Sequence, residues 1–566
     1  MQSHSTSAGA LLNPLTTLCA RGLVRPHLLA LAAALALPAT AGAQATNTWQ
    51  CTGGTWTDNP ACWSLGTPVN TQNVVIPGNP TGFDQRLLHA FGNTLSVRGI
   101  NIGADRSEPV DSVTAFLLAT GSTINVTAGI VNVGIAGNAN ARLSLTNNST
   151  LNVGTNGGSG NGLVVVGRDS SLGAPFGIGS LLMGQNSRIV GTVWVYNGLI
   201  EVSGSSDPGY RATTGEVQLL GANARATLRG SVGGLFVQNG SATLGTSDAS
   251  SVTPAFSMQV MGGAVDFVGR SVFAGGSLNG GVTTIKSGAS VTSPGTSNPV
   301  PSGIGSGAQL VLESGGSLTT QTVFNEGFIQ LQGGNLQHAG ITNRGTVTGA
   351  GYVGSGAGTF TLQPTGVVFA NGGDLVLGSR FDGSAGGAIG TKNGGRLFFY
   401  GDAAFKAGQV ITQGGTGALV VFAYRVDIGN ATQRGSLEAM TADLALQNTS
   451  NLFLDFDGAS DHDYLSTGGT LLVEGGKLTL STAGSFRAGL GSFYNVFRGT
   501  SGITGTFSSI DATAFALAPG AKLDMSNLYT TGTLAVVAVP EPATWLSLGA
   551  GLLLIGARAR RWREVA

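Results

Sequence analysis

The sequence predicts an all-β protein whose body is a parallel β-helix, or β-solenoid, built from short repeats. Gly accounts for 93 of the 566 residues, and only 10% of the residues are charged. The formal net charge is zero and 42% of the residues are hydrophobic, whereas disordered chains combine low hydrophobicity with high net charge. Short hydrophobic segments alternate with Gly, Asn, Ser and Thr, which favour tight turns. These observations indicate an ordered, β-rich body.

The strands of this body are about four residues long and alternate hydrophobic and polar side chains. Examples are residues 123–126 (TINV) and 309–312 (QLVL), with the period of two expected of a strand that has one buried face. The Asn-x-Gly triplet at 325–327 recurs 18 residues later at 343–345. A unit of about 20 residues suits one solenoid coil, because a coil buries its inward face only when it stacks on others. An array of β-sandwiches is the alternative, and it predicts longer strands.

Residues 1–43 have the organisation of a secretory signal peptide. A basic stretch without acidic residues precedes a ten-residue apolar run at 28–37 (LLALAAALAL). Small residues follow, and the order predicts cleavage after Ala43, with Ala41 and Ala43 forming the cleavage site. The run is too short to cross a membrane, which takes about 20 residues. A buried N-terminal helix is the alternative.

Residues 44–94 are expected to form an N-terminal cap over the open end of the repeat stack. Once the signal is removed, Cys51 and Cys62 are the only cysteines left, and the compartment that they enter is oxidising. We therefore expect a disulfide between them, with two free buried thiols as the alternative. Three tryptophans lie in the same segment (TWQCTGGTWTDNPACW). No third cysteine or nearby histidine completes a metal site here.

The repeat body is assigned to residues 95–450, and a further β segment to residues 451–538. The densest acidic group of the chain lies in the latter, within the stretch DFDGASDHD. Its members are Asp455, Asp457, Asp461 and Asp463. Carboxylates beside a Gly turn suit Ca²⁺, but the spacing does not match an EF-hand loop. The preferred interpretation is two strands joined by a turn, with the acids facing solvent and no metal bound.

Charge and motifs argue against nucleic-acid binding and against catalysis. Charges are sparse in the body and show no basic cluster that would contact phosphates. β-Solenoids include polysaccharide lyases and hydrolases, whose chemistry needs converging carboxylates and, in lyases, a basic residue or Ca²⁺. The chain has no nucleophile elbow, P-loop or zinc-protease motif. We expect a protein that is not an enzyme and has no cofactor, with a polysaccharide-degrading solenoid as the alternative.

The C-terminal segment, residues 539–566, differs from the body. Pro540, Glu541 and Pro542 end the β-structure, because proline cannot donate to a sheet. Residues 543–557 (ATWLSLGAGLLLIGA) are uncharged, and we expect them to form a short transmembrane helix. Fifteen helical residues span about 22 Å, less than the roughly 30 Å of a hydrocarbon core, and snorkelling arginines make up part of the difference. These arginines are Arg558, Arg560, Arg561 and Arg563.

The alternative for this segment is a helix buried in a soluble protein, in which the terminal arginines have no role. Arginines on the cytoplasmic side of the membrane would leave the body outside.

The order of these parts resembles the PEP-CTERM sorting signal: a Pro-Glu-Pro triplet, an apolar helix and terminal arginines. The resemblance implies that exosortase, an integral-membrane Cys-dependent processing enzyme of Gram-negative bacteria, recognises Pro540, Glu541 and Pro542. It also implies that residues 543–557 anchor the chain transiently in the inner membrane and that the arginines are retention charges. The body resembles autotransporter-like β-strand repeats, which implies architecture only.

Together, these features lead us to expect an exported protein that exosortase processes and that reaches the cell surface or the extracellular matrix of a biofilm. Its expected role is structural or adhesive. The family that the tail resembles is linked to extracellular polysaccharide, which is therefore the expected partner. The inner membrane is a transient contact, and nucleic acid is not an expected partner.

Overall fold

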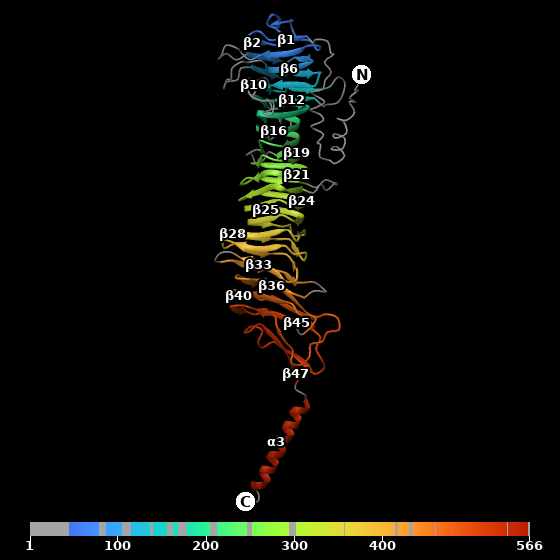
Figure 1. Ribbon diagram of the computed structural model, residues 1–566, viewed down its shortest axis with the longest axis vertical. Helices are drawn as coiled ribbons and strands as arrows, with labels where there is room; N and C mark the ends of the chain where they lie inside the picture. The colour runs from blue at the N-terminus through green and yellow to red at the C-terminus, as the bar shows by residue number, and fades with distance from the viewer. Residues whose placement is uncertain are drawn as a thin grey trace, which may run out of the picture.

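The chain forms a long rod of stacked β coils, with an α-helix projecting from its C-terminal end (Figure 1). The signal peptide with Ala41 and Ala43 lies outside the residues that this computed structural model describes, as do Pro540 and Glu541. The described residues are 45–77, 86–104, 115–135, 140–154, 162–167, 178–203, 212–245, 252–293, 302–355, 357–413, 417–429, 434–458, 460–539 and 542–563.

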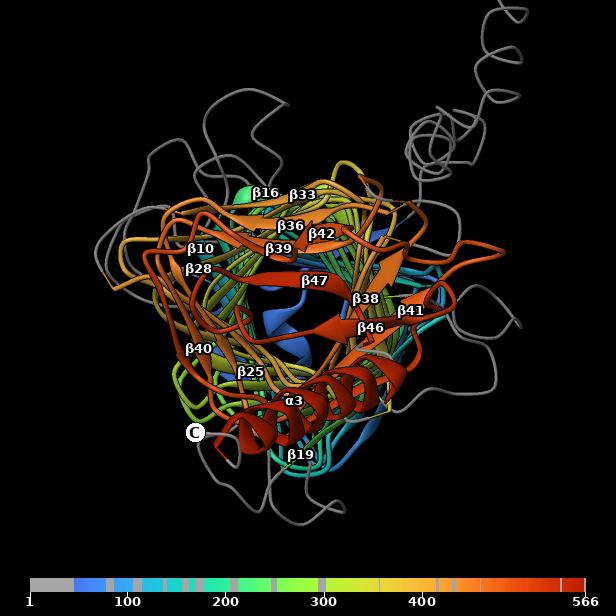
Figure 2. The same ribbon diagram turned by 90° about the horizontal axis from the view of Figure 1, so that it is seen from below.

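Three stacks of parallel strands make up the N-terminal part of the rod. In one coil these strands are β4 (Arg86–Phe91), β5 (Thr94–Val97) and β6 (Gly99–Ala104). They pair in parallel with β7 (Ala115–Thr120), β8 (Thr123–Val126) and β9 (Ile130–Val133) of the next coil, respectively. Seen along the rod, the strands surround a common interior (Figure 2). The all-β solenoid predicted from the sequence is confirmed.

Alternating side chains place the core inside the coils. In β8 (Thr123–Val126) Ile124 and Val126 are buried, while Thr123 and Asn125 face outward. Ile124 is stacked between Leu95 and Leu151 of the neighbouring coils. Each coil thus covers the apolar residues of the next, and the buried side chains form one continuous core along the rod.

Coil length varies along the rod: 27 residues separate the paired Thr123 and Thr150 near the N-terminal end, and from the middle onward the coils lengthen toward the C-terminal end. Asn325, at the end of β24 (Ser317–Asn325), pairs with Asn343, at the end of β25 (Phe328–Asn343), and the two are 18 residues apart. This confirms the offset seen in the sequence. Farther along, 22 residues separate the paired side chains of Asp374 and Arg396.

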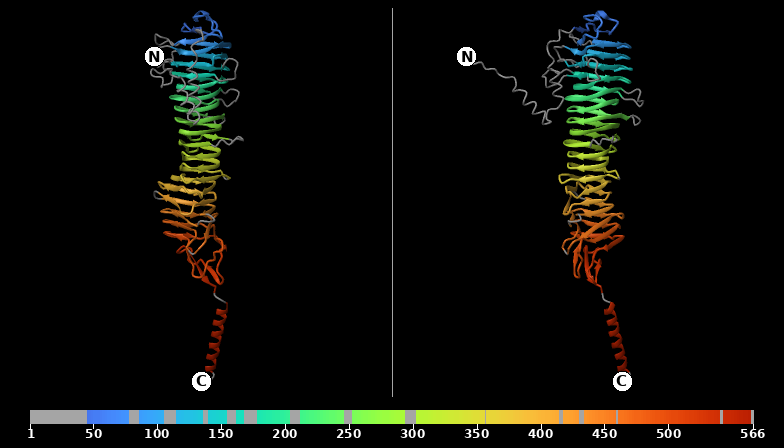
Figure 3. Two further views of the ribbon diagram at one scale, coloured as in Figure 1. Left: turned by 45° about the vertical axis from the view of Figure 1, so that its right-hand side comes forward. Right: turned by 90° about the vertical axis from the view of Figure 1, so that its right-hand side faces the viewer.

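The last coil is the longest of these examples. In it 34 residues separate Lys477 from Asp511. A longer coil admits longer turns between the strands, because only the inward positions must stay in register. The coils stack along the whole body (Figure 3).

The stack extends beyond residues 95–450 at both ends. β1 (Thr46–Thr48) pairs in parallel with β3 (Asn73–Pro77), which pairs with β6. At the other end, β38 (Asn451–Phe456) pairs with β41 (Lys477–Thr482), which pairs with β45 (Ser509–Ala514). Residues 44–94, expected as a cap, and residues 451–538, expected as a further β segment, thus both contribute strands to this stack. The connections between their strands are long, so these segments do not show the spacing of about 20 residues in the sequence.

Candidate functional site

A small antiparallel sheet closes the C-terminal end of the rod; we call it the C-terminal cap. It consists of β42 (Phe493–Asn495), β46 (Ala521–Asp524) and the central β47 (Thr533–Ala538). Tyr494 and Leu534 are fully buried and join the core of the rod. Because its strands run antiparallel, the cap does not continue the parallel edge on which a further coil would add. The cap therefore ends the stack.

The chain passes from the cap into the helix within three residues. The backbone N–H of Val539, which follows β47, donates to the carbonyl oxygen of Gly520 at 2.8 Å. The helix α3 (Pro542–Arg563) then begins with a proline, which suits a first helical position because the N–H that proline lacks would have no partner there. Figure 1 shows α3 leading away from the rod. Three residues therefore separate β47 from α3 in the sequence, and we call this connection the joint between the rod and the helix.

The apolar side chains of α3 do not pack against the rod. Leu552, Leu553 and Ile555 expose 63%, 76% and 67% of their surface, whereas a helix of a soluble protein buries its apolar stripe. No helix in the described part of the chain combines the length and hydrophobicity needed to span a bilayer. The four arginines lie in the last turns of α3: Arg558, Arg560, Arg561 and Arg563.

The acidic group at residues 455–463 surrounds an arginine from another part of the chain. The side chain of Arg434 is only 3% exposed; its Nη1 lies 3.3 Å from Oδ2 of Asp455, and its Nε lies 3.1 Å from Oδ2 of Asp457. Asp461 faces solvent. A guanidinium thus occupies the place between the carboxylates that a cation would take. Within the described ranges, no three acidic, histidine or cysteine side chains are grouped so as to hold a metal ion.

The fourth acid, Asp463, holds the turn together. It is 1% exposed, and its two carboxylate oxygens accept the backbone N–H groups of Gly435 at 2.8 Å and of Asp455 at 3.0 Å. Burial raises the pKa of Asp463 to about 7, although both N–H donors favour the charged form. Because both oxygens bind the backbone, the geometry indicates a structural carboxyl group.

A histidine and a second arginine lie beside this turn. His462 stacks on Phe456 with ring centroids 5.5 Å apart, and its Nε2 lies 3.1 Å from Nη2 of Arg498. The Arg498 guanidinium also covers the ring of Tyr464 at 3.5 Å. Burial lowers the pKa of His462, and so does the charge of Arg498.

Neither arginine could be associated with the acidic group from the sequence alone. Arg434 is 21 residues from Asp455, and Arg498 is 36 residues from His462. Because the partners lie about one coil apart in the sequence, no short sequence motif contains both of them. Only a known coil length would have suggested that these side chains meet.

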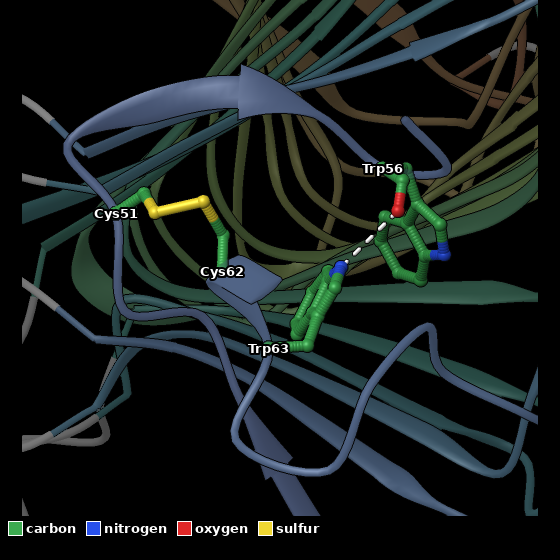
Figure 4. Close-up of a disulfide and its surroundings, with 4 residues drawn as sticks. All are labelled: Cys51, Trp56, Cys62 and Trp63. Atoms are coloured by element: carbon green, nitrogen blue, oxygen red, sulfur yellow. Dashed lines mark hydrogen bonds between the residues drawn. A yellow bond between two sulfur atoms is a disulfide. The ribbon is translucent and has the colours of Figure 1, made fainter. Parts of the chain in front are cut away.

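The opposite end of the rod is closed by a covalent loop and a tryptophan cluster. Cys51 and Cys62 form a disulfide with Cα atoms 5.3 Å apart, and Trp63 donates its indole N–H to the carbonyl oxygen of Trp56 at 3.1 Å (Figure 4). The ring of Trp49 lies 5.0 Å from that of Trp63. All three rings are buried, so they cover the core of the first coils.

Between the two ends, the outer surface repeats the same polar groups from coil to coil. Thr123 is aligned with Thr150, and Asn125 with Asn152, on neighbouring strands. The Nδ2 of Asn152 donates to Oδ1 of Asn125 at 2.9 Å. Neighbouring strands lie about 4.8 Å apart, so such rows present hydroxyl and amide groups at a regular spacing.

Comparison with known proteins identifies the tail. Residues 538–561 match the family model of the PEP-CTERM protein-sorting motif. The match does not include the rod, so the resemblance to autotransporter-like repeats is not shown. A search of curated proteins finds no relative of the chain. The motif implies export, transient anchoring in the membrane and processing by exosortase. The chain is therefore a PEP-CTERM domain-containing protein.

Proposed function

We propose that the protein is a structural or adhesive component of the cell surface or of the extracellular biofilm matrix, and that it is not an enzyme. The proposal rests chiefly on one observation: a sorting motif is joined directly to a rod that is closed at both ends. A rod of stacked coils extends its surface with every coil. A closed rod also resists end-to-end addition, which keeps the length of this surface constant.

The proposed partner is extracellular polysaccharide. Rows of Thr and Asn, such as Thr123–Thr150 and Asn125–Asn152, carry the donors and acceptors that sugar hydroxyls bind. Each contact is weak, but a long polymer that contacts many coils at once gains affinity through effective concentration. We expect binding to depend on polymer length more than on any one residue.

The alternative function is polysaccharide cleavage, and the acidic group is where the described rod concentrates its carboxylates. The geometry there supports the structural role. Asp455 and Asp457 bind Arg434, and Asp463 binds two backbone N–H groups. A glycosidase instead needs two carboxyl groups free to face the scissile bond. The purified mature protein should therefore release no reducing or unsaturated sugar from matrix polysaccharide, and sustained release would favour the enzyme.

The sorting role is tested by deleting residues 540–566 and fractionating the cells. The intact chain should reach the surface or medium in a processed form, and the deleted chain should remain in the periplasm, because it lacks both the anchor and the recognition triplet. A control variant that changes only Arg396, on the side of the rod, to Lys should be sorted normally. Normal surface delivery of the deleted chain would refute the sorting role.

Polysaccharide binding is tested by co-sedimentation of the purified rod with matrix polysaccharide of graded length. We expect the bound fraction to rise steeply with polymer length. No binding at any length would refute the adhesive proposal, and sedimentation of the rod without polysaccharide would indicate self-association instead.

A further inference from the structure

The end of the rod nearest to α3 exposes three large apolar side chains. Leu490, Phe493 and Val539 expose 57%, 60% and 44% of their surface. Phe493 lies opposite Ala535 of β47, and the N–H of Gly491 donates to the carbonyl oxygen of Val536 at 2.9 Å. The register therefore places Leu490 beside the end of β47, where Val539 continues the chain. We call these three residues the apolar rim.

The core does not require these apolar residues. Phe493 and its neighbour Tyr494 point to opposite sides of β42, and Tyr494 alone is buried. Outward positions on the coils commonly carry Thr, Ser or Asn, as Thr123 and Asn125 do. A single exposed apolar residue is ordinary, but several gathered at one end of the molecule indicate a contact surface.

The position of the rim relative to α3 suggests what this surface contacts. Val539 is held to Gly520 by its backbone N–H, and α3 begins at Pro542. Three residues of extended chain reach at most about 10 Å. Wherever the apolar part of α3 enters a membrane, the cap and its rim must therefore stand at the surface of that membrane.

Exposed cations accompany the rim. Arg487 and Lys522 are both exposed, and Lys522 lies opposite Val537 of β47. Asp524 is the acid of the same strand, and its carboxylate accepts the N–H of Ser526 at 3.0 Å. Apolar side chains that enter the interface beside basic groups match an anionic lipid surface.

We propose that the apolar rim docks on the lipid surface while α3 is anchored, so that the rod stands upright with its disulfide-bonded end farthest from the membrane. This inference rests on the anchoring that the sorting motif implies, and it adds a second contact to it. The run at 543–557 spans about 22 Å as a helix, short of a roughly 30 Å core. A rim that enters the interface would lower the free energy needed for the bilayer to thin around this short helix.

The test uses residues 44–566, the chain without its signal peptide and before exosortase processing, with its disulfide intact and bound to vesicles of phosphatidylethanolamine and phosphatidylglycerol. A spin label is attached at one new cysteine per variant: Phe493→Cys in the rim, Leu553→Cys in α3, or Phe91→Cys. Phe91 is the matched control, because it is an exposed phenylalanine (48%) on β4 near the other end of the rod. Frequent collisions of the spin label with oxygen show that the label lies in lipid. Frequent collisions with a water-soluble nickel chelate show that it lies in water.

Docking predicts that vesicles lower the nickel accessibility of the label at 493 by about threefold or more, while the label at 91 is unchanged. Equal nickel accessibility at 493 and 91, with the label at 553 in lipid, would overturn the docking and leave the anchoring intact. A water-exposed label at 553 would instead remove the anchoring, and the docking with it.

Two further outcomes would assign the rim to another partner. If the label at 493 became less accessible to nickel without lipid, and more so at higher protein concentration, the rim would bind a second copy of the chain. Protection only in membranes that contain exosortase would mean that it binds the enzyme. Either result would overturn the lipid proposal.

Discussion

Substitution of Asn325 by Ala tests how the coils are held in register. Asn325 is fully buried. Its Nδ2 donates to Oδ1 of Asn343 in the next coil at 2.7 Å and to the carbonyl oxygen of Thr346 at 3.2 Å. Its Oδ1 accepts the N–H of Gly327 at 3.2 Å. The variant removes all three hydrogen bonds from a site that water does not reach.

The expected loss follows from which groups are left without a partner. The N–H of Gly327 also donates to Ile304 at 3.0 Å, so it keeps a partner. The Oδ1 of Asn343 loses its donor, whereas the carbonyl oxygen of Thr346 keeps the ladder hydrogen bond that comes with the parallel pairing of Phe328 and Thr346. A buried polar group left unsatisfied costs about 1–3 kcal/mol. We therefore expect Asn325→Ala to lower the free energy of unfolding by about 2 kcal/mol.

Guanidinium unfolding of the mature chain measures this loss. Hydrogen exchange of residues 328–346 locates it, because stacked repeats can open locally. The control is Asn371→Ala, which removes an exposed amide pair, in which Asn393 donates to Asn371 at 2.8 Å. Water replaces that hydrogen bond, so we expect Asn371→Ala to lower the free energy of unfolding by less than about 0.5 kcal/mol.

If Asn325→Ala and Asn371→Ala lowered the free energy of unfolding by the same amount, the stabilising role of the buried hydrogen bonds would be refuted. The double variant Asn325→Ala with Asn343→Ala gives a second check. Because it removes both partners of the shared hydrogen bond, its cost should fall short of the sum of the single variants by about 1 kcal/mol or more.

Four other predictions follow from the ends and interior of the rod. Cys51→Ser should lower stability by about 3 kcal/mol in denaturant unfolding, because the disulfide closes a loop with a sequence separation of 11; an unchanged wild-type midpoint after reduction would contradict this. Arg434→Met should cost about 3 kcal/mol, since it leaves two partly buried carboxylates without their cation; a cost near zero would show that the ion pairs are dispensable. The pKa of Asp463 is raised to about 7 by burial, so its contribution to stability is full below pH 4 and is lost as pH rises through 7; Asp463→Asn should abolish this decline. Burial lowers the pKa of His338 from 6.5 to about 4, so the folded state loses stability as pH falls from 6.5 toward 4; an unfolding series of His338→Leu that keeps this loss would assign it to another group.

Much of the fold could be predicted because one face of every strand is buried. The alternation in residues 123–126 predicted a strand with Ile124 and Val126 inward, and the structure places both in the core. The Asn-x-Gly offset predicted the stacking of Asn325 on Asn343. Both signals are local or strictly periodic, so they can be read without knowing the path of the chain.

The candidate site could be predicted only in part. The sorting tail is contiguous, and its triplet, apolar run and arginines are recognisable in order. The partners of the acidic group are not contiguous: Arg434 reaches Asp455 from the preceding coil. The apolar rim was missed for the same reason, since Leu490 and Phe493 meet the end of β47 only after the chain has folded back across the cap.

By itself, the sequence determined the β class, the inward face of each strand, the 18-residue coil in the middle of the body and the sorting motif at the tail. These properties depend on neighbouring residues or on a fixed period. Only the tertiary structure decided how far the stack extends, which cation meets the acidic group and which side chains surround the joint with α3. Those outcomes depend on pairing between strands as far as 38 residues apart in the stack, where connections of variable length separate the partners and the stacking of inward apolar residues alone sets the register.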